Sequence, residues 1–231
     1  MLVYGRNVAK EVLETEKNIK NIYLQEKFNE KEIISLIKSR NLEYKILSKI
    51  EMQKKTKSLH QGIIIEIEDF KYKELSSIYN LNNALVVILD HLEDPHNFGA
   101  IIRTCEAANV NAIIIPEDRS VSVNSTVFHT SAGTTNKVNI IKVVNIASAL
   151  RELKKYGYWI VATDMNGTDY RKIDYNGKTA IVIGNEGNGI SEVVKKNSDF
   201  IASIPMKGTV NSLNASVAAG IIIFEAINIR G

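Results

Sequence analysis

Long apolar runs alternate with helix-like stretches over the C-terminal two-thirds of the chain. The runs are ALVVILD (84–90), NAIIIP (111–116), VNIIKV (138–143), GYWIVATD (157–164), TAIVIG (179–184) and DFIASIP (199–205). Near-continuous runs of this kind are typical of strands buried on both faces, as in parallel sheets covered by helices. The stretches FGAIIRTCEAAN and NIASALRELKKYG between them fit crossover helices. The pattern predicts an α/β domain with a mostly parallel sheet over residues 84–231.

The first 70 residues show shorter elements that alternate between helix-like and strand-like patterns. We expect helices at 5–16, 29–40 and 48–56 and strands at 21–25, 43–47 and 61–69. Asn29 is a good N-cap for the second helix, because its side-chain oxygen can accept a hydrogen bond from a free backbone N–H. The pattern predicts a small α/β domain over residues 1–70, followed by a polar linker at 71–83.

Composition narrows the class of protein. Of the 231 residues, 45% are hydrophobic and 24% are charged, which is ordinary for a soluble globular protein. No apolar run approaches the roughly 20 residues of a membrane span, and the first residues lack the apolar core of a signal peptide. The single cysteine, Cys105, cannot form an internal disulfide and fits core packing in a reducing compartment. We therefore expect a cytoplasmic protein without a membrane segment.

The distribution of charge gives a hint about partners. The formal net charge is +3, and the whole excess falls within residues 1–80. Within this part, residues 38–57 carry seven basic and two acidic side chains. Such a run fits either a solvated helix face or a surface that contacts nucleic-acid phosphates, and the sequence leaves both readings open.

Three loops are the candidate ligand site. Open α/β sheets bind ligands beyond the carboxyl ends of their strands, and the loops that contain unusual polar residues follow Leu89, Ile183 and Ile204. No metal is expected, because the four histidines and the single cysteine do not show the spacing of a ligand set.

The first and third loops carry polar side chains next to helices. The helix-like stretch after the first loop contains Arg103, six residues after Asn97. Its guanidinium fits either an ion pair with Glu106 or a contact with a phosphate. The third loop presents Ser212 and Asn214 ahead of a long apolar helix, where side chains and free N–H groups can bind a ligand.

The second loop, GNEGNG at 184–189, does not fit a phosphate-binding loop. Its glycines follow the order GxxGxG rather than GxGxxG, and no lysine follows them as in a P-loop. Glu186 would repel a phosphate, so a cationic or hydroxyl-bearing ligand suits this loop better. From this loop alone, a structural turn and a ligand site remain equally open.

Taken together, these loops resemble the signature of the SpoU (TrmH-type) RNA ribose methyltransferases. The segments HNFGAIIRTCEAANV, IVIGNEGNGIS and IPMKGTVNSLNASVAAGIIIFEA are similar to the first, second and third motifs of that family, in the same order. Near the N-terminus, VYGRNVAKEVL and HQGIIIEIEDF resemble the start and end of a small ribosomal-protein-like substrate domain. That domain belongs to the branch that methylates a guanosine ribose of 23S rRNA.

The resemblance implies a fold and a set of partners. It implies an RNA substrate-binding domain at 1–70 and a SPOUT-type catalytic, cofactor-binding and dimerisation domain at 84–231, whose C-terminal part forms a deep trefoil knot. It also implies S-adenosylmethionine as cofactor, ribosomal RNA as substrate, and a homodimer that shares its site across the interface. The cofactor contacts implied for this chain are Gly184, Gly187, Ile204, Met206, Leu213 and Asn214. The implied reaction-site residues are Asn97, Arg103, Glu186, Ser212 and Asn214.

The physical chemistry of methyl transfer sharpens one of these roles. The pKa of an arginine is too high for neutral guanidine to be common, so Arg103 is a poor general base. Our hypothesis is that Arg103 holds the adjacent phosphate and stabilises the developing oxyanion, while Asn97 holds the loop or the ribose. Residues 129–140 match the family pattern less cleanly, which leaves the substrate contacts of that segment open. The alternatives are the same chemistry on tRNA or on an rRNA adenosine, and a non-catalytic RNA-binding assembly factor.

Overall fold

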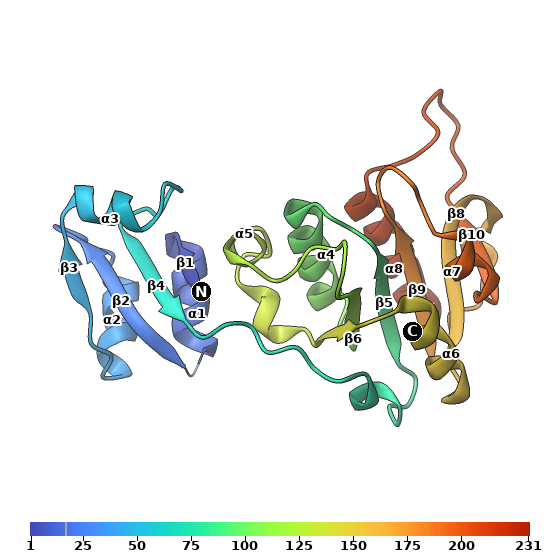
Figure 1. Cartoon of the computed structure of the whole chain (residues 1–231), viewed down its shortest axis with the longest axis horizontal. Helices are drawn as coiled ribbons and strands as arrows, with labels where there is room; N and C mark the ends of the chain where they lie inside the picture. Colours follow the sequence, from blue (N-terminus) through green and yellow to red (C-terminus); the bar gives the residue numbers. More distant parts are fainter. Residues whose placement is uncertain (17) are drawn as a thin grey trace. The chain divides into compact units, whose positions relative to one another are not determined.

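The computed structural model describes residues 1–16 and 18–231, which form two compact units (Figure 1). Unit 1 comprises Met1–Lys71 and Val123–Asn136, and unit 2 comprises Tyr72–Ser122 and Lys137–Gly231. Both units combine a β-sheet with helices, so the predicted α/β class is confirmed. Within the described residues, no helix has both the length and the apolar character that a membrane span requires.

Unit 1 is built on a mixed sheet with the strand order β1-β4-β2-β3. Its strands are β1 (Leu2–Tyr4), β2 (Ile19–Gln25), β3 (Lys45–Leu47) and β4 (Ile63–Ile67), and its helices are α1 (Arg6–Thr15), α2 (Lys31–Ser39), α3 (Lys49–Lys55) and α5 (Ser125–Thr130). Strand β2 pairs antiparallel with β4 and parallel with β3. The helices and strands predicted for the first 70 residues are present, and β1 is a further strand that the hydrophobic pattern did not reveal.

The N-terminus of α2 differs from the prediction. Asn29 does not cap this helix, because the N-cap position is occupied by Glu30 and no side chain there accepts a capping hydrogen bond. The carboxylate of Glu30 instead forms an ion pair with Arg6, with 3.1 Å between Oε2 and Nη1. The helix therefore begins one residue later than the capping preference of Asn29 predicted.

The segment 123–136 belongs to unit 1 by its packing. Phe128 of α5 is 1% exposed and lies in the same apolar cluster as Val12 of α1 and Ile65 of β4. Two hydroxyls, those of Ser131 and Thr135, share a buried hydrogen bond of 2.7 Å. The domain predicted over 84–231 included this segment, because no local sequence pattern indicates that Phe128 completes another core.

Unit 2 is built on a parallel sheet with the strand order β10-β8-β9-β5-β6-β7. Its strands are β5 (Leu85–Asp90), β6 (Ala112–Pro116), β7 (Ile140–Val143), β8 (Trp159–Asp169), β9 (Thr179–Gly184) and β10 (Phe200–Ser203). Its helices are α4 (Pro95–Ala107), α6 (Ile146–Lys155), α7 (Glu192–Lys196) and α8 (Ala215–Arg230). Short 3-10 helices lie at η1 (Leu75–Ile78) and η3 (Tyr170–Lys172), whereas η2 (Thr134–Lys137) falls almost entirely in the 123–136 segment of unit 1. The parallel sheet predicted from the apolar runs is confirmed, and the trefoil knot stays a prediction.

Helices cover both faces of this sheet. Val86 and Ile88 of β5 belong to one apolar cluster with residues of α6 and α7. Successive side chains of a strand point to opposite faces, so Val87 of β5 faces the other side, where α4 and α8 pack on each other and contact β6 and β9. Cys105 of α4 is fully buried, which raises the pKa of its thiol and confirms its role in core packing.

The segment predicted as a linker, 71–83, is attached to unit 2. The backbone N–H of Lys73 donates to the carbonyl of Ile140 at 2.8 Å, next to strand β7. Ile78 of η1 is 1% exposed, and its carbonyl accepts a 2.7 Å hydrogen bond from the Tyr158 hydroxyl. The end of this polar segment therefore packs as part of unit 2 rather than as a free connection.

Candidate active site

Two of the three predicted loops lie side by side because of strand pairing. Strands β5 and β9 are parallel neighbours, with Leu89 opposite Ile183 and Asp90 opposite Gly184. Both strands therefore end at the same edge of the sheet, and the loops that follow them start next to each other. The third loop, 204–214, leaves β10 at the edge of the sheet and makes a long excursion before it reaches α8 (Figure 1).

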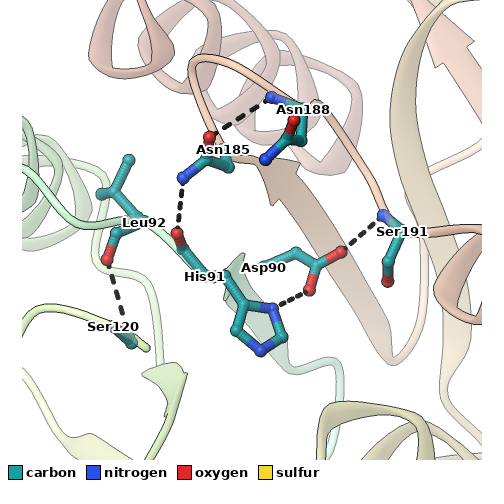
Figure 2. Close-up of polar contacts among 7 residues, drawn as sticks. All are labelled: Asp90, His91, Leu92, Ser120, Asn185, Asn188 and Ser191. Atoms are coloured by element: carbon teal, nitrogen blue, oxygen red, sulfur yellow. Dashed lines mark hydrogen bonds and ion pairs between the residues drawn. The ribbon is translucent and has the colours of Figure 1, made fainter. Parts of the chain in front are cut away.

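A buried carboxylate fixes the second loop to the end of β5 (Figure 2). Asp90 is 1% exposed, and its two oxygens contact His91 Nδ1 at 2.8 Å and the backbone N–H of Ser191 at 2.8 Å. The side-chain amide of Asn185 donates to the carbonyl of His91 at 2.7 Å. A buried carboxylate is costly unless it is hydrogen-bonded, so these contacts hold both ends of the 185–191 loop against β5.

The glycine-rich loop closes on itself. Asn185 and Gly189 exchange two backbone hydrogen bonds of 3.0 and 2.9 Å, and the Asn185 side chain accepts a third from the N–H of Gly187 at 2.8 Å. A Cβ atom at Gly184 would lie 2.5 Å from the backbone of Gly189. The glycine at 184 thus has a structural cause within its own loop. Its contact with a cofactor stays a prediction.

A network of hydrogen-bonded side chains links all three loops. Asn97 is 8% exposed, and its amide donates to Glu186 Oε1 at 2.7 Å. The side-chain oxygen of Asn97, Oδ1, accepts from the side-chain amide of Asn214 at 3.0 Å. Asn214 is in turn the N-cap of α8, where its oxygen accepts from the backbone N–H of Ser216 at 2.9 Å. The three residues come from segments up to 117 positions apart, and together they fix the geometry of the site.

The first turn of α4 places Asn97 in this position. The helix begins at Pro95, with Asp94 as an N-cap whose side chain accepts from the N–H of His96 at 2.9 Å. Proline is favoured at the first helical position because its missing N–H would have no partner there. The helix therefore starts three residues earlier than the sequence pattern predicted at Phe98, and Asn97 lies inside it.

The other predicted site residues do not take part in this network of hydrogen bonds. Arg103 is exposed, and within the described residues it forms no ion pair with Glu106 or with any other side chain. Ser212 is likewise exposed and makes no hydrogen bond in the part of the chain that the structure describes. Leu213 and Gly187 are exposed, whereas Ile204 and Met206 are half-buried. The structure therefore brings together Asn97, Glu186 and Asn214 and leaves the remaining candidates free to meet a ligand.

Sequence reasoning missed the residues that hold the loop in place. Asp90 ends an otherwise fully apolar buried strand, and a carboxylate at that point is a signal that could have identified it. A second anchor joins Asp164 of β8 to Lys195 of α7, with 2.7 Å between Oδ2 and Nζ. The hydrogen bond from Lys195 lowers the pKa of Asp164. No local pattern indicates this second pair.

The side chains of the site suit an organic cation better than a metal. Glu186 is exposed and carries a negative charge, and only a neutral amide contacts it within the described residues. In the third loop, the apolar side chain of Leu213 is exposed and that of Met206 is half-buried. No cluster of three or more His, Cys, Asp or Glu side chains that could hold a metal ion occurs in residues 1–16 and 18–231.

Two sequence families match the two parts of the chain. The SpoU rRNA Methylase family matches residues 84–224, which include the three loops of the site. The family of RNA 2'-O ribose methyltransferase substrate-binding domains matches residues 2–73. Together these matches extend over nearly the whole chain.

Named relatives match along their full length. A protein of Staphylococcus saprophyticus, named as a TrmH family tRNA/rRNA methyltransferase, is 38% identical over 100% of this chain and 96% of its own length. The Bacillus subtilis protein YacO, named in the same way, is 34% identical over 99% of this chain and 95% of its own length.

Solved structures share the fold. The AdoMet-bound rRNA methyltransferase of Sinorhizobium meliloti is 26% identical, with a TM-score of 0.84 over 98% of this chain and 86% of its own. The SpoU methyltransferase AviRb of Streptomyces viridochromogenes, at 23% identity, has a TM-score of 0.85 over 99% of this chain and 89% of its own. The three motif loops, the matched sequence families and the shared fold agree, and the chain belongs to the SpoU (TrmH-type) family of RNA methyltransferases.

Proposed function

We propose that this protein transfers a methyl group from S-adenosylmethionine to the ribose 2′-hydroxyl of a guanosine in 23S rRNA. The observation that carries the proposal is the hydrogen-bond network of Glu186, Asn97 and Asn214, which joins the three motif loops into one site. Methyl transfer depends mainly on positioning two reactants in line, so a site held rigidly from three directions suits it. The proposal places the protein in the cytoplasm, where both reactants are found.

The residues of the loops fit the proposed cofactor. S-adenosylmethionine is an organic cation with a flat adenine ring, and when bound it supplies the methyl group as an electrophile. Glu186 offers a carboxylate without a cationic partner among the described residues, which favours a positive ligand. The backbone of Gly184 and Gly187 and the apolar side chains of the third loop would hold the cofactor. That third-loop set is Ile204, Met206 and Leu213, next to the amide of Asn214.

In this proposal, Arg103 binds the RNA rather than removes a proton. It lies six residues beyond Asn97 on α4, about 9 Å along the helix axis at 1.5 Å per residue. Its guanidinium has no carboxylate partner in the described structure, so its charge is available to a phosphate. The same charge would stabilise the oxyanion that develops on the ribose, and Ser212, also free, would contact the ribose.

The extent of structural similarity favours rRNA over tRNA. The rRNA methyltransferase of Sinorhizobium meliloti covers 98% of this chain, whereas the A. aeolicus TrmH/SpoU tRNA modifying enzyme, at 34% identity and a TM-score of 0.59, covers 67%. The match to the rRNA methyltransferase is long enough to include a counterpart of the N-terminal unit, whereas the match to the tRNA-modifying enzyme leaves about a third of this chain uncovered. The names of the curated relatives include both RNAs, so the same chemistry on tRNA is the second candidate.

Helix α8 supports a homodimer. Most residues of this helix are apolar, which is typical of helices that are largely covered. Val217 and Phe224, seven residues apart and thus on one face, are each 51% exposed. A second copy of the chain would cover this face and complete the proposed shared site.

Loss of the gene should remove one ribose methylation from cellular RNA. We expect RNA from a strain without this protein to lack a single 2′-O-methylguanosine in 23S rRNA, because the proposed enzyme methylates one nucleotide of that RNA. Mapping of ribose methylation by alkaline cleavage and sequencing checks this. Loss from tRNA, or from an rRNA adenosine, would assign the substrate to one of the alternatives, and no loss at all would contradict the proposed reaction.

Replacement of Arg103 separates a phosphate contact from a general base. We expect Arg103→Ala to lower kcat/KM about 100-fold, as the loss of one electrostatic stabiliser does, and Arg103→Lys to retain part of the activity. The pH–rate profile should keep its shape in both variants. Arg151→Ala, at an exposed position of α6, is the control and should change activity less than twofold. A basic limb that disappears in the alanine variant and shifts in the lysine variant would show that Arg103 is the base.

Replacement of Asn97 tests the hydrogen-bond network that joins the loops. In Asn97→Asp the side chain can still accept from Asn214, but it loses its donor and places a second carboxylate against Glu186. We expect the Kd for S-adenosylmethionine to rise at least tenfold, measured by calorimetry. Asn188→Asp adds the same charge to the exposed tip of the glycine-rich loop and should have less than a twofold effect. Equal effects of the two variants would mean that the added charge alone, and not the loss of the hydrogen-bond network, weakens cofactor binding.

The exposed face of α8 can be tested by its effect on assembly. We expect the unaltered protein to sediment as a dimer and Phe224→Glu to sediment as a monomer with impaired methylation, because a charge cannot be buried without a partner. Val144→Glu, at a side chain that is 79% exposed between β7 and α6, should leave the dimer intact. A monomeric unaltered protein, or a dimeric Phe224→Glu variant, would rule out this interface.

A further inference from the structure

Unit 1 contains a cavity of about 700 Å³ that no part of the proposed reaction uses. Its walls come from the loop after β2, residues 25–29, and from α3 together with the residues that follow it, up to Gly62. Arg6 at the start of α1 completes it. All of these residues belong to unit 1, and a cavity of this size is typical of a site that receives a small ligand or a part of a larger one.

The walls of the cavity are held by short hydrogen-bonded turns. Gly62 has a φ of +84°, and a Cβ atom there would lie 2.9 Å from the ring of Phe28, so only glycine lets the ring lie in this place. The backbone N–H of Gln25 donates to the carbonyl of Gly62 at 2.9 Å. The side chain of Gln61 accepts from the N–H of Arg6 at 2.8 Å. The cavity is therefore formed before any ligand binds.

The lining of the cavity is strongly basic. It includes Arg6, Lys27, Lys49 and Lys57 against one acid, Glu26, which gives a formal charge of +3. This equals the net charge of the whole chain. Arg6 is paired with Glu30, but the three lysines form no ion pair or hydrogen bond within the described part of the chain. Their charges are therefore available to an anionic ligand.

The basic run 38–57 does not act as a single patch. Arg40 donates to the carbonyls of Leu13 and Glu16 and so ties α1 to the end of α2. Lys55 lies 3.7 Å from the centre of the Tyr23 ring and covers it. Of the lysines in the run, Lys49 and Lys57 line the cavity. The basic side chains of this run are therefore divided between the cavity and other surroundings.

The cavity also offers groups that recognise a nucleobase. Phe28 is half-buried in the wall, and the Arg6 guanidinium lies over its ring at 5.9 Å from the ring centre; aromatic rings and guanidinium planes are both groups on which unpaired bases stack. The amide of Gln53 can both donate and accept, like the edge of a base. His60 Nδ1 accepts from the N–H of Gly62 at 3.1 Å, so in the neutral ring the proton lies on Nε2, which is left as a donor.

We propose that this cavity receives an unpaired nucleotide of the substrate RNA. Lys27, Lys49 and Lys57 would contact the phosphates on either side, while Phe28 and Gln53 would contact the base. Sequence-specific binding of RNA uses unpaired bases, because the edges of paired bases are hidden in the deep groove of an A-form helix. The inference rests on the proposed RNA methyltransferase function, and it places substrate recognition in unit 1, outside the methyl-transfer site.

Two charge-matched double variants of the full-length protein test the proposal. Lys49→Ala with Lys57→Ala removes two charges from the cavity, whereas Lys38→Ala with Lys54→Ala removes two exposed charges of the same run that do not line it. We expect the cavity variant to raise the Kd for transcribed 23S rRNA at least tenfold and the control variant less than threefold, measured by filter binding. The slope of log Kd against log salt should fall by about 1.4, which is two contacts at about 0.7 each.

Photocrosslinking adds a readout for the base. With 23S rRNA that contains 4-thiouridine, crosslinked peptides should include residues 25–29 or 53–62 in the unaltered protein and not in the cavity variant. Equal Kd values for the two double variants, crosslinks confined to other segments, or no binding of this RNA by the unaltered protein would each overturn the proposal.

Methylation of the same RNA distinguishes this proposal from the proposed function. If the unaltered protein binds 23S rRNA through the cavity but does not methylate it, the assignment of the methylated RNA fails and the binding site stands. If both double variants methylate the RNA at the rate of the unaltered protein, the cavity proposal fails and the proposed function stands.

Discussion

The hydrogen bonds of Asn97 are the interaction on which the site depends. One side chain, nearly buried in the first turn of α4, donates to Glu186 and accepts from Asn214. Because an amide has both a donor and an acceptor, it can join a carboxylate on one side to a second amide on the other. Without it, the third loop would lose the side-chain hydrogen bond that joins it to the first, because Asp90 and Asn185 hold only the first and second loops together. The start of α8 is set by the same contacts, since Asn214 is also its N-cap.

The glycine-rich loop shows how structural and chemical demands share a few residues. Asp90 and Asn185 fix its ends, and the pairing of Asn185 with Gly189 closes it, which leaves Glu186 at an exposed position. Gly184 is required because the returning strand of the loop passes within 2.5 Å of where a Cβ would lie. A glycine motif therefore need not mean that a ligand approaches the backbone, and in this loop the charge of Glu186 is the better guide to the ligand.

The two units divide the work of an RNA-modifying enzyme in a way that their charges make visible. Among the described residues, unit 2 has a site with the Glu186 carboxylate at its centre and an arginine on α4 that forms no ion pair, whereas unit 1 has three lysines without an ion pair around its cavity. A carboxylate attracts a cationic methyl donor and repels phosphates, so the strong electrostatic hold on RNA is better placed elsewhere. Separate units allow both demands to be met.

The sequence by itself determined the parallel sheet of unit 2, the loops of the site and the resemblance that named its chemistry, because buried strands and short motifs leave local patterns. Burial of Cys105 followed for the same reason. Only the tertiary structure showed that Arg103 has no partner in Glu106, that Asn29 does not cap α2, and that Phe128 completes the core of unit 1. The cavity of unit 1 was also beyond the sequence, since its lysines come from separate turns. Contacts between residues far apart in the chain decide such features, and they leave no period or spacing to read.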